Sequence, residues 1–381
     1  MPRDTRMLPP GGALVESCAR TMQTRALIRP GPEANEIIGG CFGRALEYSG
    51  ARLVYGSVLS NHYHLLLDID DASQMSAFHC HLNSNLAREL GTLHKWKDKF
   101  WARRYRPMVI SDEPEAQLER LAYLISQGVK EGLVAHPLEW PGINSARALL
   151  EGKPIVGYWF NRTQEWKARR RKEDFDRYDY ATRYEVELHQ LPALRDLSPE
   201  EYREVTSEIV QEVAAEGAKK HKKVLGVPAI LSQNPHDPVG SAQRKSPAPM
   251  LFYASTETER DRLRTEYEDF RTIYRFAANR LCQTQSLPQD RNPARDFPQG
   301  CFPPAMPFVG GSPLPPLMTP PTRRLDVLVI DGQVTIDRPD AIPTIRVPRR
   351  PFRSVTPRFA TVTCPPGVSI AEALNRWRDP A

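Results

Sequence analysis

Proline is very unevenly spread along this chain of 381 residues, and its distribution limits where a compact core can form. Nineteen of the 36 prolines lie between Pro288 and Pro380. Proline lacks a backbone N–H and interrupts helices and central strands, so the last quarter of the chain is not expected to form one compact core. The length allows about two domains, and we expect both before residue 286.

The composition excludes several classes of protein. Hydrophobic residues make up 40% of the chain, and 52 Lys and Arg against 46 Asp and Glu give a net charge of +6. These values exclude a collagen, a membrane bundle and a wholly disordered chain. No apolar run is long enough to span a membrane, and no hydrophobic segment follows the basic N-terminus. We therefore expect neither a membrane helix nor a secretory signal, and a cytoplasmic protein.

The cysteines do not form a recognisable pattern. All six are scattered without a Cys-x-x-Cys spacing. This argues against a zinc ribbon and, in a reducing compartment, against a disulfide framework. We expect ordinary thiols.

Residues 12–145 alternate between helix-like and strand-like periodicity. One-sided apolar stripes predict helices at 32–48 and 72–93. Runs of strand-like residues predict strands at about 13–27, at 51–59, at 63–69 and at 105–110. Ser60-Asn61 marks the turn of a hairpin between the second and third strands. This order predicts an α+β fold in which helices back an antiparallel sheet.

A further helix is predicted in SDEPEAQLERLAYLISQGV, which follows the last of these strands. Asp112 and Glu115 have the spacing of a capping box, and Pro114 lies in the first turn. The apolar positions on one helical stripe should face the core: Leu118, Leu121, Ala122, Ile125 and Val129. Tyr123 and Gln127 lie one turn apart on the opposite face. We expect both to face away from the core, although such a tyrosine can also simply pack against a loop.

The character of the chain changes after Asn144. Residues 148–285 are expected to form a helical, basic accessory region, with helices from the Ser198 capping box to His221 and at 256–282. Residues 286–381 form a proline-rich tail. In this tail Asp331-Gly332 predicts a hairpin between 326–330 and 333–336, and a short helix is expected at 369–377.

Two histidines in the third strand have a spacing that suits metal binding. Side chains alternate along a strand, so His62 and His64 project on the same side and can share one metal ion. Two polar residues at a sheet edge are the alternative, and for an isolated pair the more common one. His79 and His81 lie in a predicted helix, where residues two apart diverge by about 200°. We expect that second pair to be structural or on the surface.

Three motifs in this order resemble the single-tyrosine transposases, whose DNA-cutting domain carries a His-hydrophobic-His motif. SNHYHLLLD contains the histidine pair, and FWARRY matches the Trp-x-x-x-Tyr element before the family's tyrosine helix. LAYLISQGVKEGLV followed by Trp140-Pro141-Gly142 resembles that helix. The REP-associated tyrosine transposases of bacteria have the most similar pattern. Ser126-Gln127-Gly128-Val129 departs from the family's Asn-Pro-Val and places Gln127 at its third ligand position.

The resemblance implies a ferredoxin-like HUH domain at 1–147 that acts as a single-strand DNA endonuclease and strand transferase in DNA transposition and recombination. It implies Tyr123 as the nucleophile of a 5′-phosphotyrosine intermediate, and His62, His64 and Gln127 as ligands of Mg²⁺ or Mn²⁺. The implied partner is single-stranded or hairpin DNA. The protein would act as a monomer or homodimer and would not bind a membrane. Ligand chemistry alone leaves the metal open, because imidazole also suits Zn, Fe, Ni and Cu.

Two basic clusters are candidate DNA contacts. The first precedes the tyrosine helix and the second combines a tryptophan with a basic run: Arg103, Arg104 and Arg106; Trp166, Arg169, Arg170, Arg171 and Lys172. Cations bind phosphates and an aromatic ring offers a stacking face to a base. A solvated surface is the alternative for each, and we slightly prefer it for Lys219–Lys223.

Two other functions compete with a transposase. A catalytically retired regulator could keep the fold and bind DNA hairpins, but it would have no reason to keep His62, His64, Tyr123 and Gln127. A replication-initiation or relaxase-type nuclease carries the same histidine pair. The Gly-Leu-Val and Trp-Pro-Gly matches argue against that second alternative.

Overall fold

The computed structural model describes residues 8–9, 11–238, 251–283, 297–299, 301, 327–330 and 333–336. The described residues fall into two compact units that divide after Thr265. The expected boundary between residues 147 and 148 therefore falls inside the first unit. Among the described helices, none combines the length and apolar character that crossing a membrane requires.

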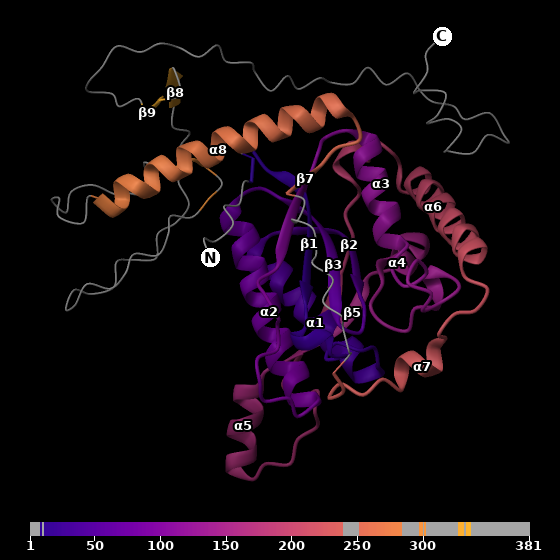
Figure 1. Ribbon diagram of the computed structural model, residues 1–381. Coiled ribbons are helices and arrows are strands. Elements are labelled where there is room, and N and C mark those ends of the chain that lie inside the picture. Colours follow the sequence, from indigo (N-terminus) through magenta and orange to yellow (C-terminus); the bar gives the residue numbers. More distant parts are fainter. Residues whose placement is uncertain are drawn as a thin grey trace. The chain divides into compact units, whose positions relative to one another are not determined.

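A five-stranded sheet forms the centre of the first unit (Figure 1). Its order is β2-β3-β1-β4-β7, and the pairs β2–β3, β3–β1 and β1–β4 are antiparallel. The strands are β1 (Ala13–Arg20), β2 (Arg52–Val58), β3 (His62–Ile69), β4 (Arg106–Ile110) and β7 (Phe252–Tyr253). The antiparallel sheet and the β2–β3 hairpin confirm the prediction. The short strand β7, which pairs parallel to β4, was not predicted.

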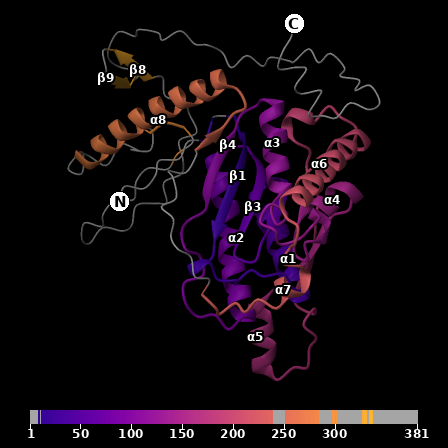
Figure 2. The ribbon, with the colours of Figure 1, turned by 45° about the vertical axis from the view of Figure 1, so that its right-hand side comes forward.

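Helices cover both faces of this sheet. On one face, α1 (Pro32–Ser49) and α2 (Ala72–Leu93) share a core with Val15, Tyr63 and Leu65. On the other face, α3 (Pro114–Ile125), α4 (Ser145–Glu151) and α6 (Pro199–Lys220) share a second core with Leu14 and Leu66. Figure 2 shows α3, α4 and α6 gathered on one side of the sheet. The predicted α+β class is confirmed.

A further layer covers the outer side of α1. It contains the antiparallel pair of β5 (Ile155–Phe160) and β6 (Ala181–Val186), and α5 (Arg162–Arg171) lies in the segment that connects these two strands. Glycines allow a close approach, because a Cβ added at Gly40 would lie 2.1 Å from the carbonyl carbon of Tyr158. The short helices of the unit are η1 (Met22–Thr24), η2 (Pro137–Glu139), η3 (Pro192–Leu194) and α7 (Val227–Leu231).

The remaining elements are a long helix and a hairpin. Helix α8 (Glu257–Gln283) runs across the position where the two units divide, and confirms the helix predicted at 256–282. Strands β8 (Val327–Ile330) and β9 (Gln333–Ile336) pair antiparallel, as predicted for this part of the tail. Asp331-Gly332 and the helix expected at 369–377 lie outside the described residues.

One predicted strand end and one predicted helix cap are wrong. The first strand ends at Arg20 rather than near Leu27, because Thr21 turns the chain and Gln23 adopts a left-handed φ of 54° that a strand cannot contain. The capping box of α3 does not form. Glu113 is the N-cap and makes no capping bond; its carboxylate instead accepts hydrogen bonds from Ser111 and from the backbone of Ser255.

Candidate active site

His62 and His64 lie on the face of the sheet that α3 covers. His64 is opposite Cys18 of β1, and His62 is opposite Arg20. The ring centroids of the two histidines are 5.1 Å apart and their planes are nearly perpendicular. The expected alternation along the strand therefore brings the two imidazoles together.

The residue between them anchors the strand from behind. Tyr63 is fully buried on the opposite face, and its hydroxyl donates to Asn83 Oδ1 of α2 at 2.8 Å. The Trp101 ring packs edge-on against Tyr63, and Tyr105 stacks on His79 at 3.7 Å. The Trp-x-x-x-Tyr element thus supports the histidine strand through the core. The buried position of His79 confirms its expected structural role.

Each imidazole uses its Nδ1 for a neighbouring oxygen. Nδ1 of His62 lies 2.6 Å from the amide oxygen of Asn61, and Nδ1 of His64 lies 3.0 Å from Oε1 of Glu16. These oxygens accept hydrogen bonds, so both Nδ1 atoms donate. The Nε2 atoms remain as the candidate ligand nitrogens.

The two histidines have opposite pKa shifts. Burial, followed by the charges of His64 and Arg20, lowers the pKa of His62 to about 3. Burial also acts to lower the pKa of His64, but hydrogen bonds with Cys18 and Glu16 outweigh it and raise that pKa to about 10. His62 is therefore neutral near pH 7. His64 carries a proton that a metal ion would have to displace from Nε2.

Helix α3 brings Tyr123 to this pair. The Tyr123 ring is half-buried and its centroid is 6.3 Å from that of His64. Two cations lie against the ring: Arg120 Cζ is 4.1 Å and Lys130 Nζ 4.5 Å from the centroid. A tyrosine, two imidazoles and two cations are thus close together, although they come from separate parts of the sequence.

Gln127 does not have the predicted surroundings. Helix α3 ends at Ile125, so Gln127 lies in the following turn, where Gly128 has a positive φ of 80°. Its side chain is 4% exposed and its Nε2 donates to the carbonyl oxygen of Tyr123 at 3.0 Å. The expectation that Gln127 faces away from the core is wrong, because the chain turns inward there. Its role as a metal ligand stays a prediction.

The donor set fits two ligand positions of a metal ion. The two Nε2 atoms lie on one face of β3, and their Nδ1 partners fix the ring orientations, which is the usual arrangement around metal-binding histidines. In the part of the chain that the structure describes, no group of three or more His, Cys, Asp and Glu side chains could hold a metal. Among the described residues, a further ligand would be of another type, such as the Gln127 amide, or would come from water or substrate.

One arginine of the first basic cluster, Arg106, lies on the same face of the sheet as the histidines. Arg106 begins β4 and pairs with Cys18, which pairs on its other side with His64. The three side chains therefore share one level and one face of the sheet. Arg103 and Arg104 are exposed in the segment before β4.

The second basic cluster lies elsewhere. Trp166 is 56% exposed on α5, and Arg170 Cζ is 4.8 Å from its ring centroid. Arg169 lies over Phe175, Arg171 pairs with an acidic neighbour, and Lys172 caps the helix. Helix α5 is bonded to α2, on the face of the sheet opposite to α3, and Figure 1 shows α5 at the other end of the unit from α3.

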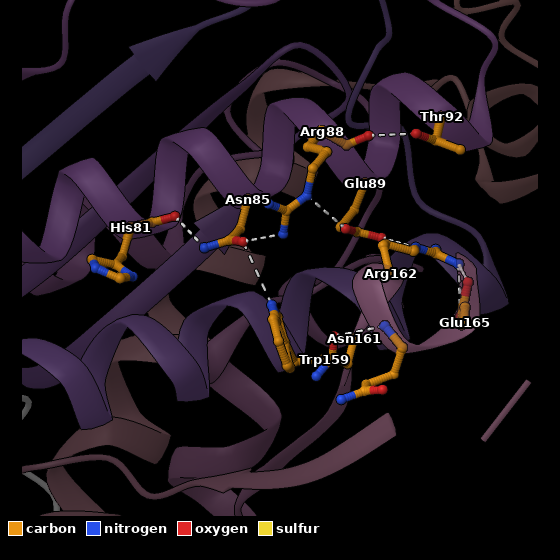
Figure 3. A network of polar contacts seen from close by, with 10 residues as sticks. His81, Asn85, Arg88, Glu89, Thr92, Trp159, Asn161, Arg162 and Glu165 are labelled. Carbon is orange, nitrogen blue, oxygen red and sulfur yellow. Dashed lines mark hydrogen bonds and ion pairs between the residues drawn. The ribbon is translucent and has the colours of Figure 1, made fainter. Parts of the chain in front are cut away.

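A buried carboxylate fixes α5 to α2 (Figure 3). Glu89 is 1% exposed and accepts hydrogen bonds from Arg162 Nε at 2.6 Å and Arg88 Nε at 3.1 Å. Arg162 also pairs with Glu165 in the first turn of α5, at 2.9 Å. Asn85 accepts from Arg88 Nη2 at 2.6 Å and extends the network along α2. The network holds the Trp166 helix against the body of the unit.

Replacing Arg162 by Met should destabilise the protein by about 1–3 kcal/mol, because it removes the closest partner of a buried carboxylate. The double change Glu89→Leu with Arg162→Met should lose less stability, since the Glu89 charge is removed with its partner and only Glu165, in the first turn of α5, loses its contact with Arg162. Urea unfolding followed by circular dichroism measures both. A single variant as stable as the wild type would show that the network does not hold α5.

Sequence reasoning missed three residues of the site. Glu16 is the only acidic residue of β1, and Arg120 is a charged residue on the buried side of α3. An isolated charge inside an apolar pattern is the signal that could have identified both. Lys130 lies in the turn after α3 and gives no such signal.

Three solved structures are similar to parts of this chain. A REP-associated tyrosine transposase bound to a REP hairpin has 15% identity and a TM-score of 0.34, over 40% of this chain and 87% of that chain. A putative transposase from Deinococcus radiodurans has 17% identity and a TM-score of 0.23, over 32% and 94%. A bacterial tRNA(His) guanylyltransferase-like protein in complex with ATP has 11% identity and a TM-score of 0.26, over 54% of this chain and 92% of that chain. No protein-family model matches the chain, and no curated protein matches its sequence.

Proposed function

We propose that this chain is a transposase that cuts and rejoins single-stranded DNA, with Tyr123 as the nucleophile. The observation that carries the proposal is the placement of the Tyr123 ring 6.3 Å from that of His64, with two cations against the ring. The sequence resemblance described above assigns the same residues to the same roles. A tyrosine with only a packing role would have no need of the histidine pair beside it.

The proposed reaction transfers one phosphodiester bond to the protein. The Tyr123 oxygen attacks phosphorus, and the bond from phosphorus to the 3′ oxygen breaks. The phenol loses its proton and the leaving 3′ oxygen gains one, so the products are a 5′-phosphotyrosine and a free 3′-hydroxyl. Attack by another 3′-hydroxyl reverses these changes and joins strands, and because a phosphate ester is kept throughout, no ATP is needed.

The charges of the site suit a phosphate. His62 and His64, with Gln127 as the proposed third ligand, would hold Mg²⁺ or Mn²⁺, which when bound polarises a non-bridging phosphate oxygen. Lys130 is exposed and lies 4.5 Å from the Tyr123 ring, so its ammonium can neutralise charge near the attacked phosphorus. Arg120 lies on the same ring but is already bonded to Glu16.

The proposed substrate is a DNA hairpin with a single-stranded flank. Arg103, Arg104 and Arg106 would bind the phosphates of the flank, since Arg106 lies at the level of His64 and the other two are exposed just before it in the chain. The second contact would come from Trp166, Arg169, Arg170, Arg171 and Lys172. Because α5 lies at the other end of the unit from α3, this contact would be with a different part of the DNA (Figure 1). Binding by both clusters should weaken steeply with salt.

Strandedness tests the proposal. We expect the full chain with Mn²⁺ to cut a hairpin in its single-stranded flank and to form a covalent adduct, visible on a denaturing gel. A strand paired in a duplex would collide with the sheet and hide the phosphate from Tyr123, so an oligonucleotide annealed to the flank should suppress cutting. Equal cleavage of paired and unpaired flanks would refute the mechanism. Hairpin binding without any adduct would instead identify a regulator that has lost catalysis.

A further inference from the structure

We propose that Glu16 and Arg120 form a buried positioning unit that holds His64 and Tyr123 in place for the reaction, an inference that rests on the proposed function. Glu16 is 5% exposed in β1, and Arg120 is 8% exposed on α3, 104 positions later. We call this pair the Glu16–Arg120 unit. Both act through other residues, so they are positioning residues.

One oxygen of Glu16 orients the histidine. Oε1 accepts the hydrogen bond from His64 Nδ1 at 3.0 Å. A carboxylate at Nδ1 fixes the plane of the ring and makes Nε2 a stronger donor to a metal ion. His62 has only the neutral Asn61 amide at the same position. Glu16 therefore sets the orientation of one of the two candidate ligands.

The other oxygen orients the tyrosine through arginine. Oε2 accepts from Arg120 Nε at 2.9 Å and also from Nη2, so two bonds fix the plane of the guanidinium. The guanidinium contacts two rings, with Cζ 4.1 Å from the Tyr123 centroid and 4.9 Å from that of Tyr253. A flat cation held in this way restricts the Tyr123 ring on one face.

Stability alone does not explain this arrangement. A buried ion pair is often no more stabilising than an apolar pair of the same volume, because both charges lose their hydration. The Glu16–Arg120 unit contacts His64, a candidate metal ligand, at one end and Tyr123, the proposed nucleophile, at the other. Asp68 provides a comparison: it is a 7% exposed carboxylate on the same face of the sheet, paired with Arg52 and Arg195, and it contacts neither His64 nor Tyr123 in the described residues.

Metal binding without DNA tests the histidine half. Mn²⁺ is titrated into the full chain, and binding is followed by electron paramagnetic resonance. The affinity of Glu16→Gln for Mn²⁺ should be about 10- to 100-fold weaker than that of the wild type. Glu16→Asp, which keeps the carboxylate, should recover part of the affinity. Asp68→Asn is the matched control and should bind Mn²⁺ like the wild type. Equal affinities of the wild type and Glu16→Gln would overturn the inference.

Kinetics test the tyrosine half. Arg120→Met should lower kcat for the hairpin substrate about 10- to 100-fold while KM stays near the wild-type value, because a misplaced nucleophile slows the chemical step and not binding. Arg120→Lys keeps the positive charge but lacks the planar guanidinium. It replaces Arg120→Met in this test if the Met variant does not fold. An unchanged kcat in a folded variant would overturn the inference. The wild type could bind Mn²⁺ more tightly than Glu16→Gln does and yet cleave no DNA. That result would count against the proposed function and still support the role of Glu16 in orienting His64.

Discussion

Replacing Tyr123 by Phe is expected to eliminate the covalent protein–DNA species and to lower cleavage by at least ~10³-fold, as loss of a nucleophile does in other enzymes. The change removes one hydroxyl and leaves the ring. The ring contacts with Arg120 and Lys130 are therefore kept. Single-turnover cleavage of the hairpin substrate with Mn²⁺ measures the effect.

Tyr48→Phe is the matched control. Tyr48 also lies on a helix, is 64% exposed and stacks on His81 on the other side of the molecule. The Tyr48→Phe variant should form the covalent adduct at the wild-type rate. Hairpin affinity should be the same for both variants, since no DNA-binding cation changes. A covalent species that persists in Tyr123→Phe would show that another residue is the nucleophile.

Local periodicity was enough to predict the centre of the fold and part of the site. The two-residue period in β3 places His62 and His64 on one face, and the apolar stripes of α1 and α2 identify the helices behind it. These features depend on neighbours in the sequence. For the same reason the α+β class could be predicted without knowing how the layers meet.

Features that depend on distant contacts could not be predicted. The strands β5 and β6 can pack on α1 because Gly40 and Gly157 approach each other closely. No local sequence pattern reveals this contact. The burial of Gln127 follows from the end of α3 two residues earlier, where the helical stripe no longer applies. Glu16 and Arg120 meet only after the sheet has brought their segments together.

The double variant His62→Ala with His64→Ala should lose metal-dependent cleavage and bind Mn²⁺ more than ~100-fold more weakly, because both candidate imidazole ligands are removed. The domain should remain folded. Strand β3 is held from behind by Tyr63, Leu65 and Leu67, which point into the opposite core and are not changed. We expect a loss of stability of about 1–3 kcal/mol, measured by urea unfolding, and Mn²⁺ binding measured by calorimetry.

His79→Ala and His81→Ala separate a loss of metal ligands from a general loss of histidine. His79 is buried against Tyr105 and His81 stacks on Tyr48, so both lie away from the face that carries His62 and His64. His79→Ala should destabilise the protein through lost packing but leave Mn²⁺ affinity unchanged, and His81→Ala should change little. Unchanged Mn²⁺ binding in the His62/His64 variant would refute the metal site. Because Tyr123 would still lie beside Lys130 and Arg120, residual covalent adduct in that variant would show that these cations alone can support attack on the phosphate.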